Sequence, residues 1–238
     1  MKIIASIQAR YNSARLPGKV LLPIAGKSSL ERIYERLLTC RELDGVVIAA
    51  GEDGCVPIMR HAREKGLRII TGSEDDLIAR HRYACSAMQA DAFVRITADC
   101  PLVSPEIVDQ CCALLSARYA HGVDFVSNTI RRTYPDGLDV EVVSMRLLAR
   151  LDATPGVDRE AFCRWFIQNG PEEQMYNLLN NEDLSDVRLT LDAEDDRKKI
   201  ENLLTKCWEH ARWSDYAAAS DRLGYLRVPS KDHIVRRA

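Results

Sequence analysis

Short apolar runs alternate with longer segments of helical periodicity through the first half of the chain. The runs have the length of buried strands, and they cover residues 3–8, 46–50, 68–71, 92–97 and 124–127. Between them, apolar residues recur three and four positions apart, which is the spacing of an amphipathic helix. Repeated strand–helix–strand units predict an α/β fold with a doubly wound, mostly parallel sheet that carries helices on both faces.

Polar residues and glycine mark the ends of the predicted helices. Ser28 precedes Glu31 by three positions, which is a capping box ahead of an apolar stripe. Gly66 ends the second helical segment, and Ser73 precedes an acidic first turn of the third. Ser104, directly before a proline, starts the fourth. These signals support the helix assignments independently of the apolar spacing.

The alternation stops after residue 128. Beyond a polar stretch rich in turn formers, the predicted elements are strands over 140–143, 174–179 and 187–191, and helices over 145–151, 158–168 and 193 to about 210. No internal repeat or low-complexity linker divides the chain. We therefore expect a single domain over 1–238, with an inserted flap or dimerisation arm over 129–180 and a tail over 225–238.

The inserted segment predicts a homodimer. Leu138, Val140 and Val142 alternate with polar residues, so an extended arm here would present an apolar face. Such an arm has little reason to project from a monomer, because it would expose apolar side chains and a strand edge to water. A second copy of the chain would cover both.

Composition narrows the classes of partner. The 238 residues are 46% hydrophobic and 29% charged, as in soluble globular proteins, and the formal net charge is −2. This balance argues against duplex nucleic acid and against an anionic membrane surface. No apolar stretch approaches the roughly 20 residues of a membrane span, and no export signal opens the sequence, so we expect a cytoplasmic protein. The eight cysteines form no C-x-x-C pair and are expected to be reduced and buried.

A cationic loop, QARYNSARLPGK, follows the first predicted strand. Gly18 lets backbone N–H groups approach an anion, and Lys19 adds a mobile positive charge. Arg10 and Arg15 add planar forks that match phosphate oxygens. The loop matches neither the Walker motif nor the dinucleotide fingerprint. It predicts a polyphosphate site, with an ordinary basic surface loop as the alternative.

Two aspartates follow predicted strands at what would be one edge of the sheet. Asp99 follows the strand over 92–97, and Asp192 follows the strand over 187–191. Ligands of doubly wound sheets bind at the carboxyl ends of the strands, where the cationic loop also lies. Two carboxylates beside a triphosphate are typical ligands of Mg²⁺. The alternatives are a turn residue before Pro101 for Asp99 and a helix N-cap for Asp192.

Four ordered motifs resemble the cytidylyltransferases that make CMP-activated sugar acids. The resemblance is to the spore-coat-polysaccharide type in particular, which is related to the CMP-KDO and acylneuraminate synthetases, and it spans roughly the first 200 residues. The motifs are Q-A-R with S and R-L-P-G-K in the first loop, R-I-T-A-D-C-P-L from Arg95, P-D-G-L-D-V-E-V from Pro135, and V-R-L-T-L-D from Val187.

The resemblance implies a Rossmann-like nucleotide-diphospho-sugar transferase fold and a Mg²⁺-dependent enzyme. The enzyme would transfer CMP from CTP to a small sugar acid or similar acceptor for surface-glycan biosynthesis, with release of pyrophosphate. Lys19, Arg10 and Asp99 would be catalytic, and Asp99 and Asp192 would bind the metal. The nucleotide would be bound by Ala9, Arg10, Ser13, Arg15, Gly18, Lys19, Gly72, Ser73 and Thr97. Among these, Ala9, Gly72, Ser73 and Thr97 would contact the base or ribose.

Acidic residues in the polar insertion predict the acceptor site. Asp136, Asp139 and Glu141 would bind sugar hydroxyls or amino groups, and Arg159 would bind a carboxylate or phosphonate. A solvated surface position is the alternative for Glu141. The resembled family often continues the Arg-Glu pair with His, where this chain has Ala161. This departure affects the acceptor half of the prediction and leaves the CTP half unchanged.

Two other functions would keep the same fold. A sugar-1-phosphate nucleotidylyltransferase would use another nucleoside triphosphate, but such enzymes carry a Gly-rich first loop that this chain lacks. A non-catalytic nucleotide-sugar-binding protein would not require Lys19, Asp99 and Asp192, all of which are present. We therefore favour the cytidylyltransferase.

Overall fold

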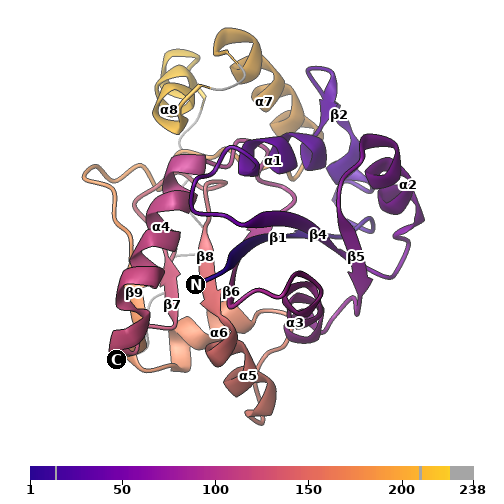
Figure 1. Cartoon of the computed structure of the whole chain (residues 1–238). Coiled ribbons are helices and arrows are strands. Elements are labelled where there is room, and N and C mark those ends of the chain that lie inside the picture. Colours follow the sequence, from indigo (N-terminus) through magenta and orange to yellow (C-terminus); the bar gives the residue numbers. More distant parts are fainter. Residues whose placement is uncertain (14, 209–210, 226–238) are drawn as a thin grey trace.

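The structure, a computed structural model, describes residues 1–13, 15–208 and 211–225, so most of the predicted tail lies outside the described residues. Its centre is a seven-stranded sheet in the order β5-β4-β1-β6-β8-β7-β9 (Figure 1). The strands are β1 (Ile3–Ala9), β4 (Gly45–Gly51), β5 (Ile69–Gly72), β6 (Ala92–Thr97), β7 (Phe125–Ser127), β8 (Glu141–Ser144) and β9 (Met175–Asn177). A small hairpin, β2 (Pro23–Ile24) with β3 (Lys27–Ser28), lies apart from it.

The sheet is mostly parallel, as the alternation of strands and helices predicts. β5, β4, β1 and β6 are parallel neighbours, and β9 is parallel to β7. Only β8 runs against its neighbours, because it is antiparallel to both β6 and β7. The five strands predicted in the first half are confirmed to within one or two residues.

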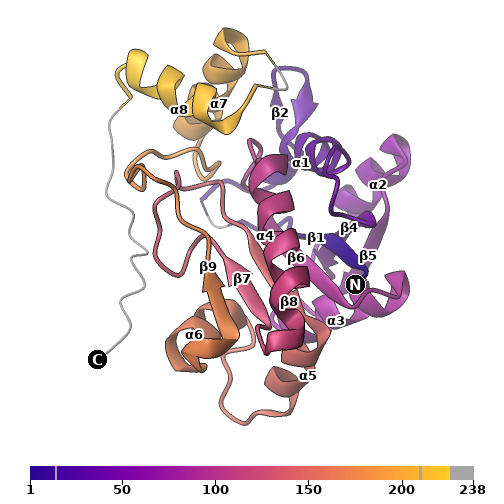
Figure 2. The same ribbon diagram turned by 60° about the vertical axis from the view of Figure 1, so that its left-hand side comes forward.

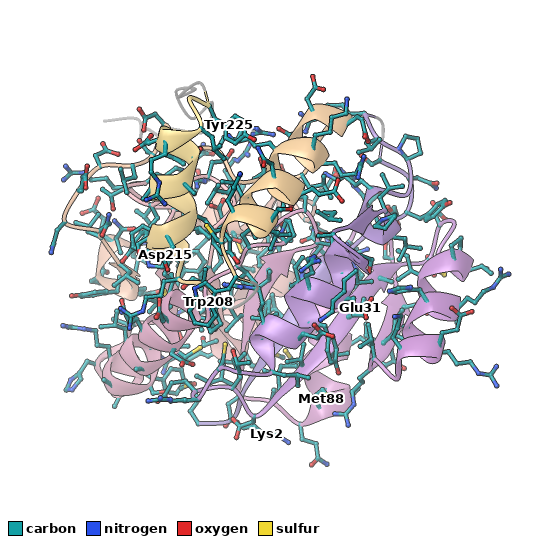
Figure 3. All side chains as sticks on the ribbon, turned by 90° about the horizontal axis from the view of Figure 1, so that it is seen from above. Lys2, Glu31, Met88, Trp208, Asp215 and Tyr225 are labelled. Atoms are coloured by element: carbon teal, nitrogen blue, oxygen red, sulfur yellow. The ribbon has the colours of Figure 1, made fainter. Side chains whose placement is uncertain are left out.

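Helices cover both faces of the sheet. One face packs against α1 (Ser29–Leu37), α2 (Val56–Lys65) and α4 (Pro105–Arg118), and the other against α3 (Leu77–Met88), α5 (Met145–Ala153) and α6 (Phe162–Asn169). The last helices, α7 (Glu194–Lys206) and α8 (Trp213–Arg222), form a layer at one end of the molecule, opposite α5 and α6 (Figures 1 and 2). Trp208 and Tyr225 belong to this layer (Figure 3).

The predicted helix starts are partly confirmed. Ser28 and Ser104 accept hydrogen bonds from the backbone N–H groups three residues later, at 3.1 and 3.3 Å. The third helix starts later than predicted: its N-cap is Asp76, whose carboxylate accepts from the N–H of Ala79. Ser73 instead accepts from the N–H of Asp76, so it closes the turn before the helix. No described helix is long and apolar enough to cross a membrane.

The apolar alternation after residue 128 belongs to the core and not to a projecting face, which corrects the reason for expecting an arm there. Leu138, Val140 and Val142 are 0% exposed, because the chain here enters β8 at the middle of the sheet. The segment over 129–180 supplies β8, α5, α6 and β9 to the same sheet and core. The homodimer itself stays a prediction.

Replacing Val140 by Asp is therefore expected to unfold the subunit and not merely to separate two subunits. An unpaired charge in a fully buried position costs about 4 kcal/mol or more, which would lower the melting temperature by at least about 8 °C. Val56→Asp is the matched control, because Val56 is 63% exposed and the change should stay within about 0.5 kcal/mol. Equal melting curves for the two variants would contradict the buried position of Val140.

The segment over 187–191 is extended but is not a strand of the sheet, contrary to the prediction. It is held by a single bridge between Asp136 and Arg188 and by a hydrogen bond from the N–H of Leu191 to the carbonyl of Asp99, at 2.8 Å. Gly137 (φ +102°) allows this approach, since a Cβ there would stand 2.7 Å from the carbonyl carbon of Leu189. The segment therefore delivers Asp192 to the carboxyl end of β6 by packing across it.

Candidate active site

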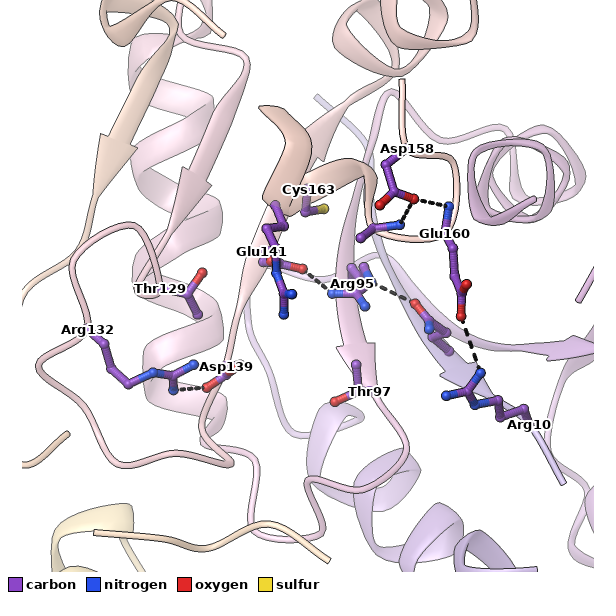
Figure 4. A pocket seen from close by; sticks show the side chains of 13 residues that line it. Arg10, Arg95, Thr97, Thr129, Arg132, Asp139, Glu141, Asp158, Glu160 and Cys163 are labelled. Atoms are coloured by element: carbon purple, nitrogen blue, oxygen red, sulfur yellow. Dashed lines mark hydrogen bonds and ion pairs between the residues drawn. The ribbon is translucent and has the colours of Figure 1, made fainter. Parts of the chain in front are cut away.

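Two adjoining cavities lie where β1, β6 and β8 meet the segment that ends at Asp192. The first, of about 310 Å³, is lined mainly by the cationic loop and is called the loop pocket. The second, of about 390 Å³, lies beside β8 and is called the β8 pocket (Figure 4). Both are lined by Gln8, Arg10, Arg95 and Thr97, so the pockets share a wall.

The cationic loop is held by a left-handed turn at Gly18. Gly18 has φ +69° and donates its N–H to the carbonyl of Tyr11 at 2.9 Å, so the loop folds back on itself. A Cβ on Gly18 would stand 3.2 Å from the ring of Tyr11. Lys19 follows at once and starts a short 3₁₀ turn, Lys19–Leu21. This turn aims Lys19 into the loop pocket, while Gly18 itself does not line it.

Lys19 lies between the two predicted aspartates. Its Nζ donates to Asp99 Oδ2 at 3.0 Å and to Asp192 Oδ1 at 2.8 Å, and its side chain is only 11% exposed. Burial alone would lower the pKa of Lys19, but the two carboxylates outweigh burial and raise that pKa above its usual value. Burial would likewise raise the pKa of Asp192, but its bonds to Lys19 and Arg188 lower it. Lys19 and Asp192 are therefore both charged near neutral pH.

Asp192 is the most heavily paired carboxylate of the site. Besides Lys19, it binds Arg15 at 2.8 Å and Arg188 at 2.5 Å. It does not cap the following helix, because the carboxylate of Asp196 accepts the N–H groups of Asp192 and Ala193. Three cations therefore converge on one buried carboxylate, which favours a site that exchanges these contacts for an anionic ligand.

The two carboxylates fit a divalent cation. Both reach the same Lys19 Nζ, so this ammonium stands where a metal ion could take one oxygen from Asp99 and one from Asp192. Mg²⁺ is bound in this way by one or two protein carboxylates, with water and phosphate oxygens as the remaining ligands. Among the described residues no group of three or more His, Cys, Asp and Glu side chains converges. The site therefore suits a cation that arrives with phosphate.

The β8 pocket is lined by charges that are already paired. Arg95 donates from Nε to Gln8 Oε1 at 2.7 Å and from Nη1 to Glu141 (Figure 4). Arg132 forms a two-pronged ion pair with Asp139 on one side of the pocket (Figure 4). Burial would lower the pKa of Arg95, but Glu141 outweighs burial and raises it. A ligand of this pocket meets both donors and acceptors, with little uncompensated charge.

Comparison with known proteins identifies the family. The sequence profile of the cytidylyltransferase family matches residues 4–151. The chain belongs to this family. It is 28% identical over 217 residues to the spore coat polysaccharide biosynthesis protein SpsF of Bacillus subtilis. The aligned region covers 87% of this chain and 88% of that protein.

Solved structures of cytidylyltransferases agree with the fold. A cytidylyltransferase from Leptospira borgpetersenii superposes with a TM-score of 0.89 at 27% identity, over 98% of this chain and 100% of that one. A CMP:2-keto-3-deoxy-manno-octonic acid synthetase solved with CTP superposes with a TM-score of 0.67 at 17% identity, over 87% and 99% of the two chains. The resemblance read from the four motifs and the predicted α/β fold are thus confirmed.

Most residues predicted for this cytidylyltransferase lie at the cleft. Those that line the loop pocket are Arg10, Ser13, Arg15, Lys19, Thr97, Asp99 and Asp192. Asp139 and Glu141 line the β8 pocket, and Glu141 is buried, so it is not the solvated surface residue of the alternative interpretation. Asp136 lies beside the site, where it binds Arg188 at 2.8 Å. Ala9, Gly18, Gly72 and Ser73 line neither pocket.

Arg159 lines neither of the two pockets, so its predicted role in acceptor binding stays a prediction without support from the cleft. It binds Asp76 at 2.8 Å and Asp152 at 2.7 Å and lines a separate groove between α3 and α5. Its chain neighbours Asp158 and Glu160 do line the β8 pocket. The side chain of Arg159 is directed to these two carboxylates on neighbouring elements, and a sequence pattern cannot show that partnership.

Sequence reasoning missed several lining residues of this cytidylyltransferase. They are Gln8, Arg95, Arg132, Glu160, Arg164 and, beside Asp192, Arg188. One signal was available for Arg95, because a charged residue inside the apolar run over 92–97 must face a polar partner or a cavity. Arg132 and Arg164 carry no such signal, since they stand in polar or amphipathic surroundings.

Buried polar atoms without partners also occur beside the ends of β4 and β5, on residues that line neither of the two pockets. Arg80 is 2% exposed, yet among the described residues its Nε and Nη1 have no hydrogen-bond partner, and neither does Glu74 Oε2. A Cβ at Gly51 would stand 1.7 Å from Glu74 Oε2, so a larger residue there would displace the end of this side chain. Burial raises the pKa of Glu74 and lowers that of Arg80. Unpaired buried donors are costly, and a polar ligand would satisfy them.

Proposed function

We propose that the enzyme transfers CMP from CTP to a small sugar acid or similar acceptor, with release of pyrophosphate, in the biosynthesis of a surface glycan. The observation that carries this proposal is the convergence of Lys19 and Arg15 on Asp192 in the loop pocket, directly beside a second polar pocket. The name of the Bacillus subtilis relative, a spore coat polysaccharide biosynthesis protein, supports the glycan role.

The loop pocket is suited to the triphosphate. Arg10, Arg15 and Lys19 supply positive charge and Ser13 a hydroxyl, and all four side chains line one cavity. In phosphoryl transfer, catalysis consists mainly of positioning the groups and neutralising charge on the leaving oxygens. A bound Mg²⁺ would add positive charge at the bridging and leaving oxygens, with Asp99 and Asp192 as its protein ligands. Lys19 would bind the oxygens on which the leaving pyrophosphate gathers charge.

The unpaired groups of Arg80 and Glu74 support a base subsite at β4 and β5. Cytosine presents the acceptors O2 and N3 next to the N4 amino donor, which complements a guanidinium beside a carboxylate. Gly72 and Ser73, predicted to contact the base, adjoin this pair, and a Cβ at Gly72 would stand 3.3 Å from Arg80 Cγ. Cytosine would satisfy both kinds of orphaned atom, whereas uracil offers no amino donor.

The β8 pocket is suited to the acceptor. Asp139 and Glu141 can accept hydrogen bonds from sugar hydroxyls, and their arginine partners can donate to a carboxylate. An acceptor oxygen would attack the α-phosphorus near the shared wall: the new P–O bond forms, the bond to pyrophosphate breaks in line, and the acceptor proton passes to solvent. The arrangement holds two substrates on opposite sides of one reacting centre.

We also propose a cytoplasmic homodimer that pairs through the segment over 129–180. This segment contains β9, which ends the sheet, so one edge of β9 is unpaired within the described residues. An unpaired strand edge favours association with another chain.

The nucleotide assignment predicts a selective thermal stabilisation by CTP. CTP with Mg²⁺, at about 100 times its dissociation constant, should stabilise the fold by about 2.7 kcal/mol and raise the melting temperature by about 5–10 °C. UTP, GTP and ATP at the same concentration should give smaller shifts. Pyrophosphate release from CTP with a panel of acidic sugars then identifies the acceptor. A larger shift with UTP or GTP would contradict the assignment.

A further inference from the structure

The guanidinium of Arg95 lies in the wall that the loop pocket and the β8 pocket share. Two of its three nitrogens are held: Nε by Gln8 and Nη1 by Glu141. Within the part of the chain that the structure describes, Nη2 takes part in no hydrogen bond or ion pair. The side chain is 19% exposed and lines both cavities. Figure 4 shows Arg95 in the middle of the residues that line the β8 pocket.

Three adjacent strands fix the orientation of this side chain. Arg95 is on β6, and it pairs in register with Ser6 on β1 and with Glu141 on β8. Gln8 follows Ser6 on the same face of β1. The guanidinium is therefore bound from one side by Gln8 on β1 and from the other by Glu141 on β8. Side chains held on rigid elements present their remaining donors in a fixed direction. Nη2 is therefore a preoriented donor at the boundary of the two pockets.

Stability of the sheet does not account for the Arg95–Glu141 pair. Phe93, two positions before Arg95 on the same face, and Val143, its partner on β8, are fully buried and apolar. A buried ion pair is seldom more stabilising than a well-packed apolar pair of similar volume. The Arg95–Glu141 pair occurs where this face of the sheet opens from the core into a cavity. Its position points to a ligand.

We propose that Arg95 Nη2 binds an anionic oxygen at the junction of the two pockets. That oxygen belongs either to the α-phosphoryl group of the nucleotide or to a carboxylate of the acceptor, because both would lie at the shared wall. The proposal rests on the proposed function and adds a binding residue to it. Glu141 balances the charge of Arg95 and leaves one donor for the ligand.

The test removes the ion pair as a whole, because the removal of Arg95 alone would leave Glu141 buried and unpaired. The variant is Arg95→Met with Glu141→Met, which replaces two paired charges by apolar side chains of similar volume. Arg82→Met is the matched control, because it removes an arginine that pairs with Asp152 outside the cleft. Melting curves first establish that the double variant folds; if it does not, Arg95→Lys, which keeps the charge but loses the fork, replaces it.

Calorimetry with cytidine and CMP distinguishes the two sources of the anion. If the ligand is the α-phosphoryl group, the variant should bind CMP at least tenfold more weakly than the wild type and cytidine equally well. If it is the carboxylate, CMP binding should be unchanged and KM for the acidic acceptor at least tenfold higher, and KM should rise in the same way in Arg95→Lys, which keeps Glu141 but loses the fork. Wild-type values for CMP affinity and for acceptor KM and kcat would overturn the proposal. Failure of the proposed function would show earlier, as a wild type that neither prefers CMP to cytidine nor releases pyrophosphate.

Discussion

Lys19→Met is expected to lower turnover by about 10²-fold or more, the usual effect of removing one preorganised charge from the site of a developing anion. Its ammonium lies between Asp99 and Asp192 and is nearly buried, so its charge is screened little by water. The affinity for cytidine should change little, because the proposed base subsite lies on other elements. Turnover by pyrophosphate release and cytidine affinity by calorimetry measure the two effects.

The same variant should strengthen direct binding of Mn²⁺ to the nucleotide-free protein. Lys19 occupies the point at which both carboxylates converge, and a divalent cation cannot take these oxygens while the ammonium holds them. Removal of the ammonium leaves two carboxylates available, and we expect a rise in Mn²⁺ affinity of about tenfold. Lys65→Met is the control. Lys65 lies outside the cleft, and its Nζ forms a comparable ion pair with Glu31, with an N–O distance of 3.0 Å. If the variant has wild-type turnover and wild-type Mn²⁺ affinity, Lys19 has no role in catalysis or in blocking the metal site.

Local sequence signals predicted the parallel half of the fold well. The strands that became β1, β4, β5 and β6 are continuous apolar runs, as expected when both faces of a strand are covered. Gly66 ends α2 in a left-handed conformation, as its position after the apolar stripe predicts. In such segments, the residues that set the secondary structure also set the packing, so local and tertiary preferences agree.

The second half was predicted less completely, because long-range contacts decide it. An apolar alternation such as Leu138, Val140 and Val142 fits a strand that packs in its own core as well as one that packs on a partner. Here the strand packs in its own core because β8 inserts between β6 and β7, and no local pattern in the sequence shows that these two strands are not direct neighbours. The segment over 187–191 likewise resembles a strand, yet it crosses the end of β6 because Gly137 allows close backbone contact.

The site shows the same division. Lys19 and Asp99 could be predicted because the ends of the parallel strands β1 and β6 meet at one edge of the sheet. Asp192 also lies there and shares the ammonium of Lys19 with Asp99, although the segment before it is not the strand on which its prediction rested. Arg159 could not be placed, because its direction depends on the carboxylates of Asp76 and Asp152 on other elements. Arg80 lies within an ordinary helical stripe, and only its unpaired buried nitrogens single it out.

Asp99→Asn is expected to lower turnover by about 10²-fold while the fold is retained. The amide has the shape of the carboxylate but no charge, so it cannot hold Lys19 by an ion pair and binds a divalent cation more weakly. The backbone carbonyl of Asp99, which accepts from Leu191, is unaffected, and the melting temperature should therefore stay near that of the wild type.

The dependence of rate on Mg²⁺ concentration provides the decisive measurement for Asp99. If its carboxylate is a metal ligand, the variant should require a higher Mg²⁺ concentration for half-maximal rate, and its maximal rate should remain low. Asp195→Asn is the matched control, because Asp195 makes the same change of net charge near Asp192 on a side chain that is 98% exposed. The wild-type rate and the wild-type Mg²⁺ dependence in Asp99→Asn would reduce Asp99 to a turn residue that pairs with Lys19. Asp192 would then be the only carboxylate of the pair left to bind the metal, despite the three cations already on it.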